Sequence, residues 1–444
     1  MLGEIKFMNK PKIIKFKNGA TFIYQKDNRN NYSSVVIGFQ AGHNYNTKNG
    51  LAHFLEHMLF NGTKNKTKEK ISEVIEEIIP SLNAYTSSNL LAINFSRTNK
   101  LFEKSMEFAG EILTQTKLSE EHIKTERGVI KEEYRIKNDK SIRNLSYQHG
   151  FLLYNNKMTN EMSLGCEKDI DNITLQDLQD FHDKYFLLEN FYGCYVGNLP
   201  WFKVKKILYK YVFKNVDSNI NFKQDRIERE IDKEPSMQVV TNEDKTISLK
   251  LSFKFNLPFK LLKLTFEQNY LSRYFLRNKN MLYVNLRNKG LIYSCSINNS
   301  YNFDTQLFNI IIKTSKEKLM AVLKEVNKSI KYLLYHELTN EELTKLKNNA
   351  IYIWDEILDY SKMDNAVNYL DLLLNEGKGN NLYLVKTNKR IKAAKKVTIK
   401  SINDFKHKIF NKDNLPYITF MGDIKKEDLP TYKQICNIIY KGIK

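Results

Sequence analysis

Two histidines and a glutamate stand in the order H-x-x-E-H within GLAHFLEHMLFNGT, residues 50–63. On a helix, positions i and i+4 lie one turn apart on the same face, so His53 and His57 can both reach one metal ion, with Glu56 beside them. Catalytic zinc takes three protein ligands and keeps one position for water, and a nearby carboxylate can accept the proton of that water. The spacing therefore predicts a zinc site with Glu56 as the general base. The alternative is a pair of surface histidines on a helix.

A second predicted helix, SEEHIKTERGVIKEEYRIKND at residues 119–139, offers a third ligand. Glu126 and Glu133 are seven positions apart and share a predicted face with Val129 and Ile130, so this face carries two carboxylates toward the interior. Buried carboxylates need partners, and a zinc ion would be one. The alternative is a helix that is merely charged and solvated.

The chain contains one internal repeat. Residues from Thr174, TLQDLQDFHDKYFLLEN, match residues from Thr398, TIKSINDFKHKIFNKDN, at a constant offset of 398 − 174 = 224 positions. Each copy has the pattern of an amphipathic helix followed by a short apolar strand that ends at a glycine, Gly197 or Gly422. The repeat predicts an α+β fold made of two homologous α/β halves, each a mainly antiparallel sheet with helices packed on it.

The boundaries of the two halves follow from a change in composition. Residues 213–235 are polar, charged and poor in apolar periodicity, which is typical of a linker. We therefore expect a zinc-bearing half at residues 1–212 and a related half without the metal motif at residues 236–444. Neither half contains a GxGxxG or P-loop pattern, so nothing indicates a nucleotide site.

Composition excludes two classes of function. The chain has 444 residues and a net charge of +20, but its lysines are scattered and no recognition motif accompanies them, so we expect no nucleic-acid partner. No apolar run approaches the length of a membrane-spanning helix, so we expect no membrane partner either.

Cysteine usage and the first residues of the chain bear on the compartment. Cys166, Cys194, Cys295 and Cys436 are far apart, which indicates neither a disulfide framework nor a thiolate zinc site. The first residues, MLGEIKFMNKPKIIKF, have no apolar core of a secretory signal and no transit-peptide pattern. These observations predict a cytoplasmic protein.

The inverted zinc motif, the FNGT that completes its segment and the glutamates of ERGVIKEE together resemble the pitrilysin/insulinase family of zinc peptidases, especially its mitochondrial-processing-peptidase-like branch. The resemblance implies that His53, His57 and Glu133 bind one Zn²⁺ ion and that Glu56 is the general base. It also implies that Glu126 supports the site from outside the metal's own ligands.

A segment after the zinc motif, SLNAYTSSN at residues 81–89, resembles the edge strand with which this family pairs the substrate backbone. The resemblance implies that Asn83 faces the scissile bond and that Ala84, Tyr85 and Thr86 offer backbone amides and carbonyls. Pairing with a sheet edge selects extended chains and makes little demand on their sequence.

In the second half, NLRNKGLIYS resembles the family segment whose arginine and tyrosine bind the substrate and stabilise the developing oxyanion. Arg287 and Tyr293 are the corresponding residues, one position closer together than the family pattern. For Tyr293 the alternative is an ordinary buried tyrosine of a strand.

The resemblance also implies an architecture and an activity. The chain would form half of a clamshell, and two such chains, in a homodimer or a heterodimer with a related subunit, would close around a chamber. The expected activity is a zinc-dependent endopeptidase that hydrolyses short peptides, leader sequences or unfolded segments enclosed there. The alternative is a non-catalytic or partner-dependent structural subunit, against which the presence of all four chemical residues argues.

Overall fold

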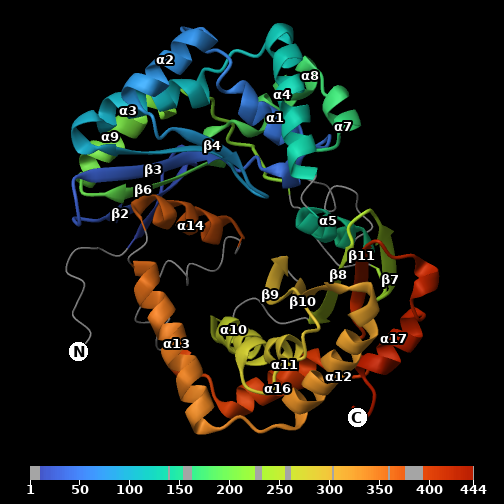
Figure 1. Cartoon of the computed structure of the whole chain (residues 1–444). Helices are drawn as coiled ribbons and strands as arrows, with labels where there is room; N and C mark the ends of the chain where they lie inside the picture. The colour runs from blue at the N-terminus through green and yellow to red at the C-terminus, as the bar shows by residue number, and fades with distance from the viewer. Residues whose placement is uncertain are drawn as a thin grey trace. The chain divides into compact units, whose positions relative to one another are not determined.

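Figure 1 shows the computed structural model of the chain, which divides into two compact units. The first unit comprises residues 1–137, 161–227 and 358–386, and the second comprises residues 138–160, 228–357 and 387–444. Within the described residues no helix has both the length and the apolar character needed to cross a bilayer. The structure describes residues 11–443 except 139–140, 154–162, 226–232, 256–261, 303–304, 359–360 and 376–393.

The first unit is built on a sheet with the strand order β1-β2-β6-β3-β5-β4. Neighbouring strands are antiparallel except for β2 and β6, which are parallel. Because side chains alternate along a strand, Val35 and Ile37 of β3 face one layer of helices and Val36 faces the other side. The strands are β1 (Lys12–Lys15), β2 (Thr21–Lys26), β3 (Tyr32–Phe39), β4 (Asn83–Thr86), β5 (Leu91–Thr98) and β6 (Phe191–Gly197).

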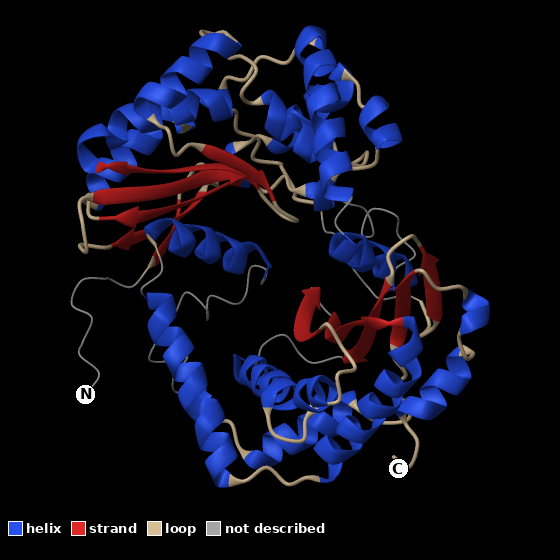
Figure 2. Cartoon of the chain, in the orientation of Figure 1, coloured by secondary structure: helices blue, strands red, loops and turns tan. Residues whose placement is uncertain are grey.

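Helices cover both faces of this sheet, and the two faces are unequal (Figure 2). One face carries most of the helices of the unit, and the other carries α14 (Lys362–Asn375), which packs on β3, β5 and β6. The helices of the first face and its surroundings are α1 (Leu51–Met58), α2 (Lys68–Ile78), α3 (Asn99–Thr114), α4 (Glu120–Asn138), α7 (Glu167–Asp171), α8 (Leu175–Tyr185) and α9 (Trp201–Tyr211), with short 3₁₀ turns at His43–Tyr45, Leu188–Asn190 and Phe213–Asn215.

The second unit is built on a sheet with the order β7-β11-β8-β10-β9, in which β7 and β11 are parallel and the other pairs are antiparallel. Its strands are β7 (Met237–Thr241), β8 (Thr246–Phe255), β9 (Ser294–Asn302), β10 (Thr305–Ser315) and β11 (Tyr417–Gly422). Ile418 and Phe420 of β11 join the main apolar core, whereas Thr419 points to the opposite face. There the His149 imidazole of α5 (Ser141–Leu153) hydrogen-bonds Thr419.

The remaining helices of the second unit surround its main core. They are α10 (Leu262–Arg277), α11 (Leu282–Asn288), α12 (Leu319–Tyr335), α13 (Asn340–Leu358), α16 (Ile399–Ile409) and α17 (Tyr432–Ile439), with 3₁₀ turns at Lys316–Lys318 and η5 (Lys426–Asp428). As the periodicity predicted, Ile402, Phe405 and Ile409 of α16 are buried in that core.

The internal repeat is visible in the topology, and the α+β fold of two related halves is confirmed. The helix and strand of the first copy are α8 and β6, and those of the second are α16 and β11. Thr174 and Thr398 are the equivalent N-caps, and each side chain accepts a hydrogen bond from a backbone N–H in the first turn. The order β2-β6-β3-β5-β4 of one sheet repeats as β7-β11-β8-β10-β9 in the other, and within the residues that the structure describes β1 has no counterpart.

The division into units differs from the predicted halves at two helices. Helix α5 comes from the first half of the sequence but packs on β8 and β11 of the second unit, and α14 comes from the second half but packs on the first sheet. Their apolar residues are buried there; Leu370 of α14, for example, is in one buried cluster with Val36 of β3 and Cys194 of β6. An amphipathic pattern shows that a helix face is buried and does not show which sheet buries it.

The predicted linker also contributes to the first unit. Phe213 is buried in its core, and the hydroxyl of Tyr185 donates a 2.6 Å hydrogen bond to Asp225. The amide of Leu188 bonds the carbonyl of Asp217, which holds the same segment to the 3₁₀ turn before β6. Residues 226–232 of the predicted linker lie outside the described residues.

Candidate metal centre

Helix α1, which carries the H-x-x-E-H motif, is fixed at both ends by side-chain hydrogen bonds. The amide of Ala52 donates to Oδ1 of Asn46 over 2.8 Å, and Nδ2 of Asn61 donates to the carbonyl of His57 over 2.8 Å. The residue before the helix, Gly50, has a φ of 78°, and a Cβ on it would lie 2.2 Å from the carbonyl oxygen of Leu164. Glycine is therefore required at the start of this helix.

The structure brings His53, His57 and Glu133 together. One ligand atom from each side chain lies within 4.8 Å of the other two. Among the described residues, this is the one group of three or more His, Cys, Asp or Glu side chains that could hold a metal ion. Oε2 of Glu133 lies 3.5 Å from Nε2 of His53 and 3.3 Å from Nε2 of His57. Two imidazole nitrogens and one carboxylate oxygen converging in this way form a donor set suited to catalytic zinc.

Helix α4 places both of its predicted glutamates at α1. Glu126 is buried, and its Oε2 lies 3.1 Å from Nδ1 of His57. Its Oε1 accepts a 2.9 Å hydrogen bond from the ammonium of Lys68. Burial acts to raise the pKa of Glu126, but the hydrogen bonds from His57 and Lys68 outweigh it and lower the pKa to about 2.

An ionised Glu126 can only accept a hydrogen bond, so the Nδ1 of His57 must carry the proton in this contact. The lone pair of His57 is then on Nε2, the atom that faces Glu133. A carboxylate that fixes the tautomer of a ligating histidine is a common arrangement around protein-bound zinc.

The helix face that carries Glu126 differs from the predicted one in one residue. Ile123 and Ile130 are buried with Glu126, whereas Val129 is half exposed. Position 129 is three residues after 126 and four before 133, but it lies at the border of the face that positions 123, 126, 130 and 133 define, so its side chain is not covered. The expectation that Val129 shares the face was therefore wrong, and that for Ile130 was right.

Glu56 lies against strand β4. The hydroxyl of Thr86 donates a 2.7 Å hydrogen bond to Oε2 of Glu56. Within the described residues β4 pairs only with β5, with Asn83 opposite Asn94 and Thr86 opposite Leu91, so β4 is an edge strand. The segment predicted to pair with a substrate backbone is thus beside the motif helix.

The side chains of β4 alternate between two environments. Ala84 and Thr86 lie on the side of α1, and Ala84 packs against the main core. Tyr85 packs with Leu370 and Leu374 of α14 on the opposite face, and burial raises the pKa of its phenol above the usual value. Asn83 is exposed. The amide of Ser87 donates to the carbonyl of Leu90, so in this register Tyr85 turns its backbone groups toward Ala92 of β5, while Ala84 and Thr86 turn theirs to the outer edge.

Arg287 and Tyr293 belong to the second unit, and both are exposed. Arg287 is in α11, where its Nη1 donates a 2.9 Å hydrogen bond to the hydroxyl of Tyr283. Tyr293 precedes β9 and is 64% exposed, and its amide donates to the carbonyl of Lys313. The alternative of an ordinary buried strand tyrosine is therefore wrong for Tyr293.

Sequence reasoning missed two contacts of the site, the ion pair of Lys68 with Glu126 and the hydrogen bond of Thr86 with Glu56. Lys68 begins α2, directly after the N-cap Thr67, and nothing in that pattern points to α4. Thr86 was expected to act through its backbone, and only its position beside α1 shows the role of its hydroxyl.

Several proteins resemble the chain in sequence. It is 26% identical over 217 residues to the zinc protease PqqE of Helicobacter pylori, which covers 48% of this chain and 49% of that protein, so the match spans about half of the relative's length. It is 30% identical over 151 residues to the β subunit of the human mitochondrial-processing peptidase, covering 33% of this chain and 31% of that protein.

Solved structures share the fold. A protease from Helicobacter pylori matches with a TM-score of 0.75 at 21% identity, over 93% of this chain and 99% of that one. The first half of the periplasmic protease PqqL from Escherichia coli matches with a TM-score of 0.77 at 17% identity, over 98% of this chain and 96% of that one.

The comparison with PqqL contradicts the predicted cytoplasmic location, because that structural neighbour is a periplasmic protease. The prediction rested on four separated cysteines and on the first residues of the chain, and it was wrong to read a compartment from them.

Two family models together match most of the chain. The one described as "Insulinase (Peptidase family M16)" matches residues 21–152, the part that holds α1, β4 and α4. The one described as "Peptidase M16 inactive domain" matches residues 172–350, which extend from the first copy of the repeat into the second unit. The chain belongs to the insulinase family of peptidases, peptidase family M16.

Proposed function

We propose that this chain is a zinc-dependent endopeptidase. The observation that carries the proposal is the convergence of His53, His57 and Glu133 within 4.8 Å, with both histidines on the helix that also carries Glu56, which is not part of the group. His53 and Glu126 are buried in this centre. This composition, three ligands and one additional carboxylate, is that of a hydrolytic zinc site rather than of a closed structural one.

The residues fit the ion by their chemistry. His53 and His57 would bind through imidazole nitrogens and Glu133 through a carboxylate oxygen. A zinc ion held there acts as a Lewis acid toward a carbonyl oxygen and acidifies water. Glu56 would take the proton of the attacking water, and Thr86 holds the carboxylate of Glu56 in place through the 2.7 Å hydrogen bond.

The substrate would be a short peptide, a leader sequence or an unfolded segment. The edge of β4 supports this, since an extended chain can add to it as a further strand directly beside Glu56. Asn83, which is exposed, and the backbone of Ala84 and Thr86 would contact it, whereas the backbone of Tyr85 faces β5. Arg287 and Tyr293 would bind the substrate and stabilise the oxyanion. Both side chains are exposed rather than packed in a core, so they are accessible to a substrate.

A second chain would complete the working enzyme, in a homodimer or a heterodimer with a related subunit. Two relatives support this. The present chain matches only 51% of the full-length PqqL structure, so a second chain would correspond to the other half. The human relative is named as one subunit, the β subunit, of the mitochondrial-processing peptidase. The experiment is size-exclusion chromatography with light scattering on the purified chain.

The activity is tested with a quenched fluorescent peptide library. Cleavage by the wild type that stops with a chelator, returns with added zinc and is absent in Glu56→Gln supports the proposal. Activity that is unchanged in the presence of the chelator, or full activity in Glu56→Gln, contradicts the proposal. Bound zinc with no cleavage of any peptide by the chain alone or with candidate partners would favour the structural-subunit alternative.

A further inference from the structure

Strand β7 (Met237–Thr241) forms one edge of the second sheet. Its counterpart in the first unit, β2, has the antiparallel strand β1 on its outer side. Within the described residues β7 pairs with β11 alone, so the second sheet ends one strand earlier than the first. The internal repeat therefore shows where an added strand would lie.

The direction of the backbone groups of β7 follows from one hydrogen bond. The amide of Ile418 donates to the carbonyl of Ser236 over 2.9 Å, so Ser236 and every second residue after it face β11. In a parallel ladder the residues between them turn both N–H and C=O the other way. Met237, Val239 and Thr241 thus present their backbone donors and acceptors at the outer edge, where a further strand would bind them.

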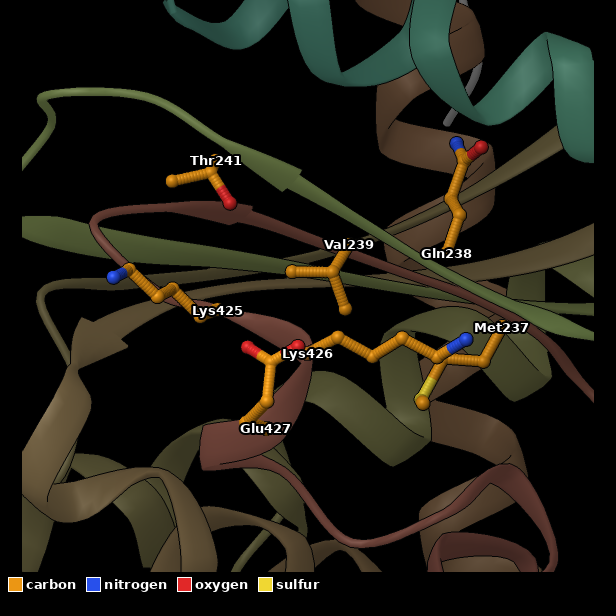
Figure 3. Close-up of a pocket in the computed structure, with 7 residues that line it drawn as sticks. All are labelled: Met237, Gln238, Val239, Thr241, Lys425, Lys426 and Glu427. Atoms are coloured by element: carbon orange, nitrogen blue, oxygen red, sulfur yellow. The ribbon is translucent and has the colours of Figure 1, made fainter.

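A cavity of about 470 Å³ lies along this edge, lined by Met237, Gln238, Val239, Thr241, Lys425, Lys426 and Glu427 (Figure 3). Met237 and Val239 are partly buried and pack against the core, which gives the cavity an apolar floor. The hydroxyl of Thr241 donates to the carbonyl of Ile424, which ties β7 to the turn that forms the other wall. The same edge therefore offers both backbone groups and a place for a side chain.

The opposite wall is a turn with two lysines. Asp428 holds this turn by accepting a 2.9 Å hydrogen bond from the amide of Lys425 and by pairing with Lys316. Figure 3 shows Lys425 extending toward the Thr241 end of the strand and Lys426 toward the Met237 end, with Glu427 between them. Within the described part of the chain the structure records no ion pair for either ammonium group.

We infer that the edge of β7 is a docking site for an extended acidic peptide segment of another protein chain. The segment would add as an antiparallel strand, as β1 does to β2, with an apolar side chain above Val239 and an acidic side chain near each lysine. Glu427, between the lysines, disfavours a third acidic residue in the middle of the segment. All residues of this site lie in the second unit, and the inference does not depend on the metal centre.

The test measures binding directly. The probe is a fluorescein-labelled peptide, Glu-Thr-Val-Thr-Glu, whose first, third and fifth side chains share one face and whose length equals that of β7. Fluorescence anisotropy is recorded on the full chain carrying Glu56→Gln, which prevents cleavage of the probe. A peptide with lysine in place of both glutamates and a peptide N-methylated on its backbone amides should bind about tenfold more weakly or not at all.

Two variants of the chain test the two parts of the site. Val239→Pro removes an outward amide without touching the ladder to β11, and we expect about tenfold weaker binding. Lys425→Glu with Lys426→Glu should weaken binding about fivefold or more at low salt. The matched control reverses two exposed lysines elsewhere in the same unit, Lys408 and Lys412, and should bind like the parent.

Equal binding by all variants, or no binding by the parent, overturns the inference. Thermal melts of each variant show whether it is folded, and a folded Val239→Pro variant with unchanged affinity is decisive against the edge. If sedimentation shows that the chain self-associates and that Val239→Pro abolishes this, the edge binds a second copy and the acidic-peptide assignment is wrong.

Discussion

The hydroxyl of Thr86 donates a 2.7 Å hydrogen bond to the Oε2 of Glu56, and so connects the edge strand β4 with the motif helix α1. The contact joins the residue proposed to move a proton with the strand proposed to hold the substrate. A substrate strand added to β4 would therefore be aligned with the same carboxylate that acts on it.

Thr86→Val removes the hydroxyl and keeps the shape of the side chain. We expect kcat to fall about tenfold with little change in KM, because the carboxylate loses its orientation while the backbone of β4 stays in place. Steady-state cleavage of a fluorogenic peptide measures both parameters. Thr86→Ser, which retains the hydroxyl, is the control and should be close to wild type; an unchanged kcat in Thr86→Val would show that the bond has no role in catalysis.

Glu126→Gln tests the support of His57. The amide can still accept a hydrogen bond from His57, but the negative charge that pairs with Lys68 is lost. We expect zinc to be held about tenfold less tightly. The measurement is zinc content after dialysis against graded chelator, and the control is Glu121→Gln, at an exposed position of the same helix. Identical zinc retention in both variants would contradict the supporting role.

Gly50→Ala should disturb the start of the motif helix. The φ of 78° and the 2.2 Å approach of the carbonyl oxygen of Leu164 leave no room for a methyl group. We therefore expect the free energy of unfolding to fall by about 1 to 3 kcal/mol. Gly128→Ala in α4 is the matched control, since a Cβ there meets nothing within 4 Å, and it should be neutral or stabilising by up to about 1 kcal/mol. Urea unfolding of both variants measures the difference.

Leu370→Ala tests whether α14 belongs to the core of the first unit. Leu370 is fully buried in a cluster with residues of β3 and β6. Its truncation should lower the free energy of unfolding by about 2 to 5 kcal/mol. Asn368→Ala, at an exposed position on the same helix, should cost little. If both variants unfold at the same urea concentration as the wild type, the packing of α14 does not contribute to stability.

Glu342 gives a pH dependence that is independent of the metal centre. Burial acts to raise its pKa, but hydrogen bonds from the Thr339 amide and from the side chains of Asn278 and Tyr274 lower it from 4.5 to about 2. The ionised form is therefore favoured by folding, and its contribution is complete above about pH 4.5 and is lost as the pH falls toward about 2. The difference in unfolding free energy between wild type and Glu342→Gln should shrink across that interval, and a constant difference would contradict the assignment.

The features that could be predicted from the sequence are those encoded locally. The i, i+4 spacing of His53 and His57 defines a helix face, and the 224-position repeat defines two related halves, because both patterns lie within one element or one supersecondary unit. The spacing of Glu126 and Glu133 placed them on one helix for the same reason, although the neighbouring Val129 was assigned to the wrong side.

Contacts between distant elements could not be predicted in this way. The bond of Thr86 to Glu56 and the ion pair of Lys68 with Glu126 depend on how β4 and α2 pack beside α1 and α4, and no periodicity within those segments encodes a partner. The same holds for α5 and α14, whose apolar faces are evident in the sequence but whose sheets are not.

The placement of α14 affects how the protein can be synthesised. All strands of the first sheet have been made once the ribosome reaches Gly197, yet the helix that covers Ile23, Val36 and Cys194 of that sheet is encoded after residue 361. The nascent first unit therefore exposes this apolar face during synthesis of more than 160 further residues (361 − 197 = 164). The last packing step of this unit therefore waits until Asn375 has been made, and a gene cut at the linker would yield a fragment that keeps the same apolar face exposed.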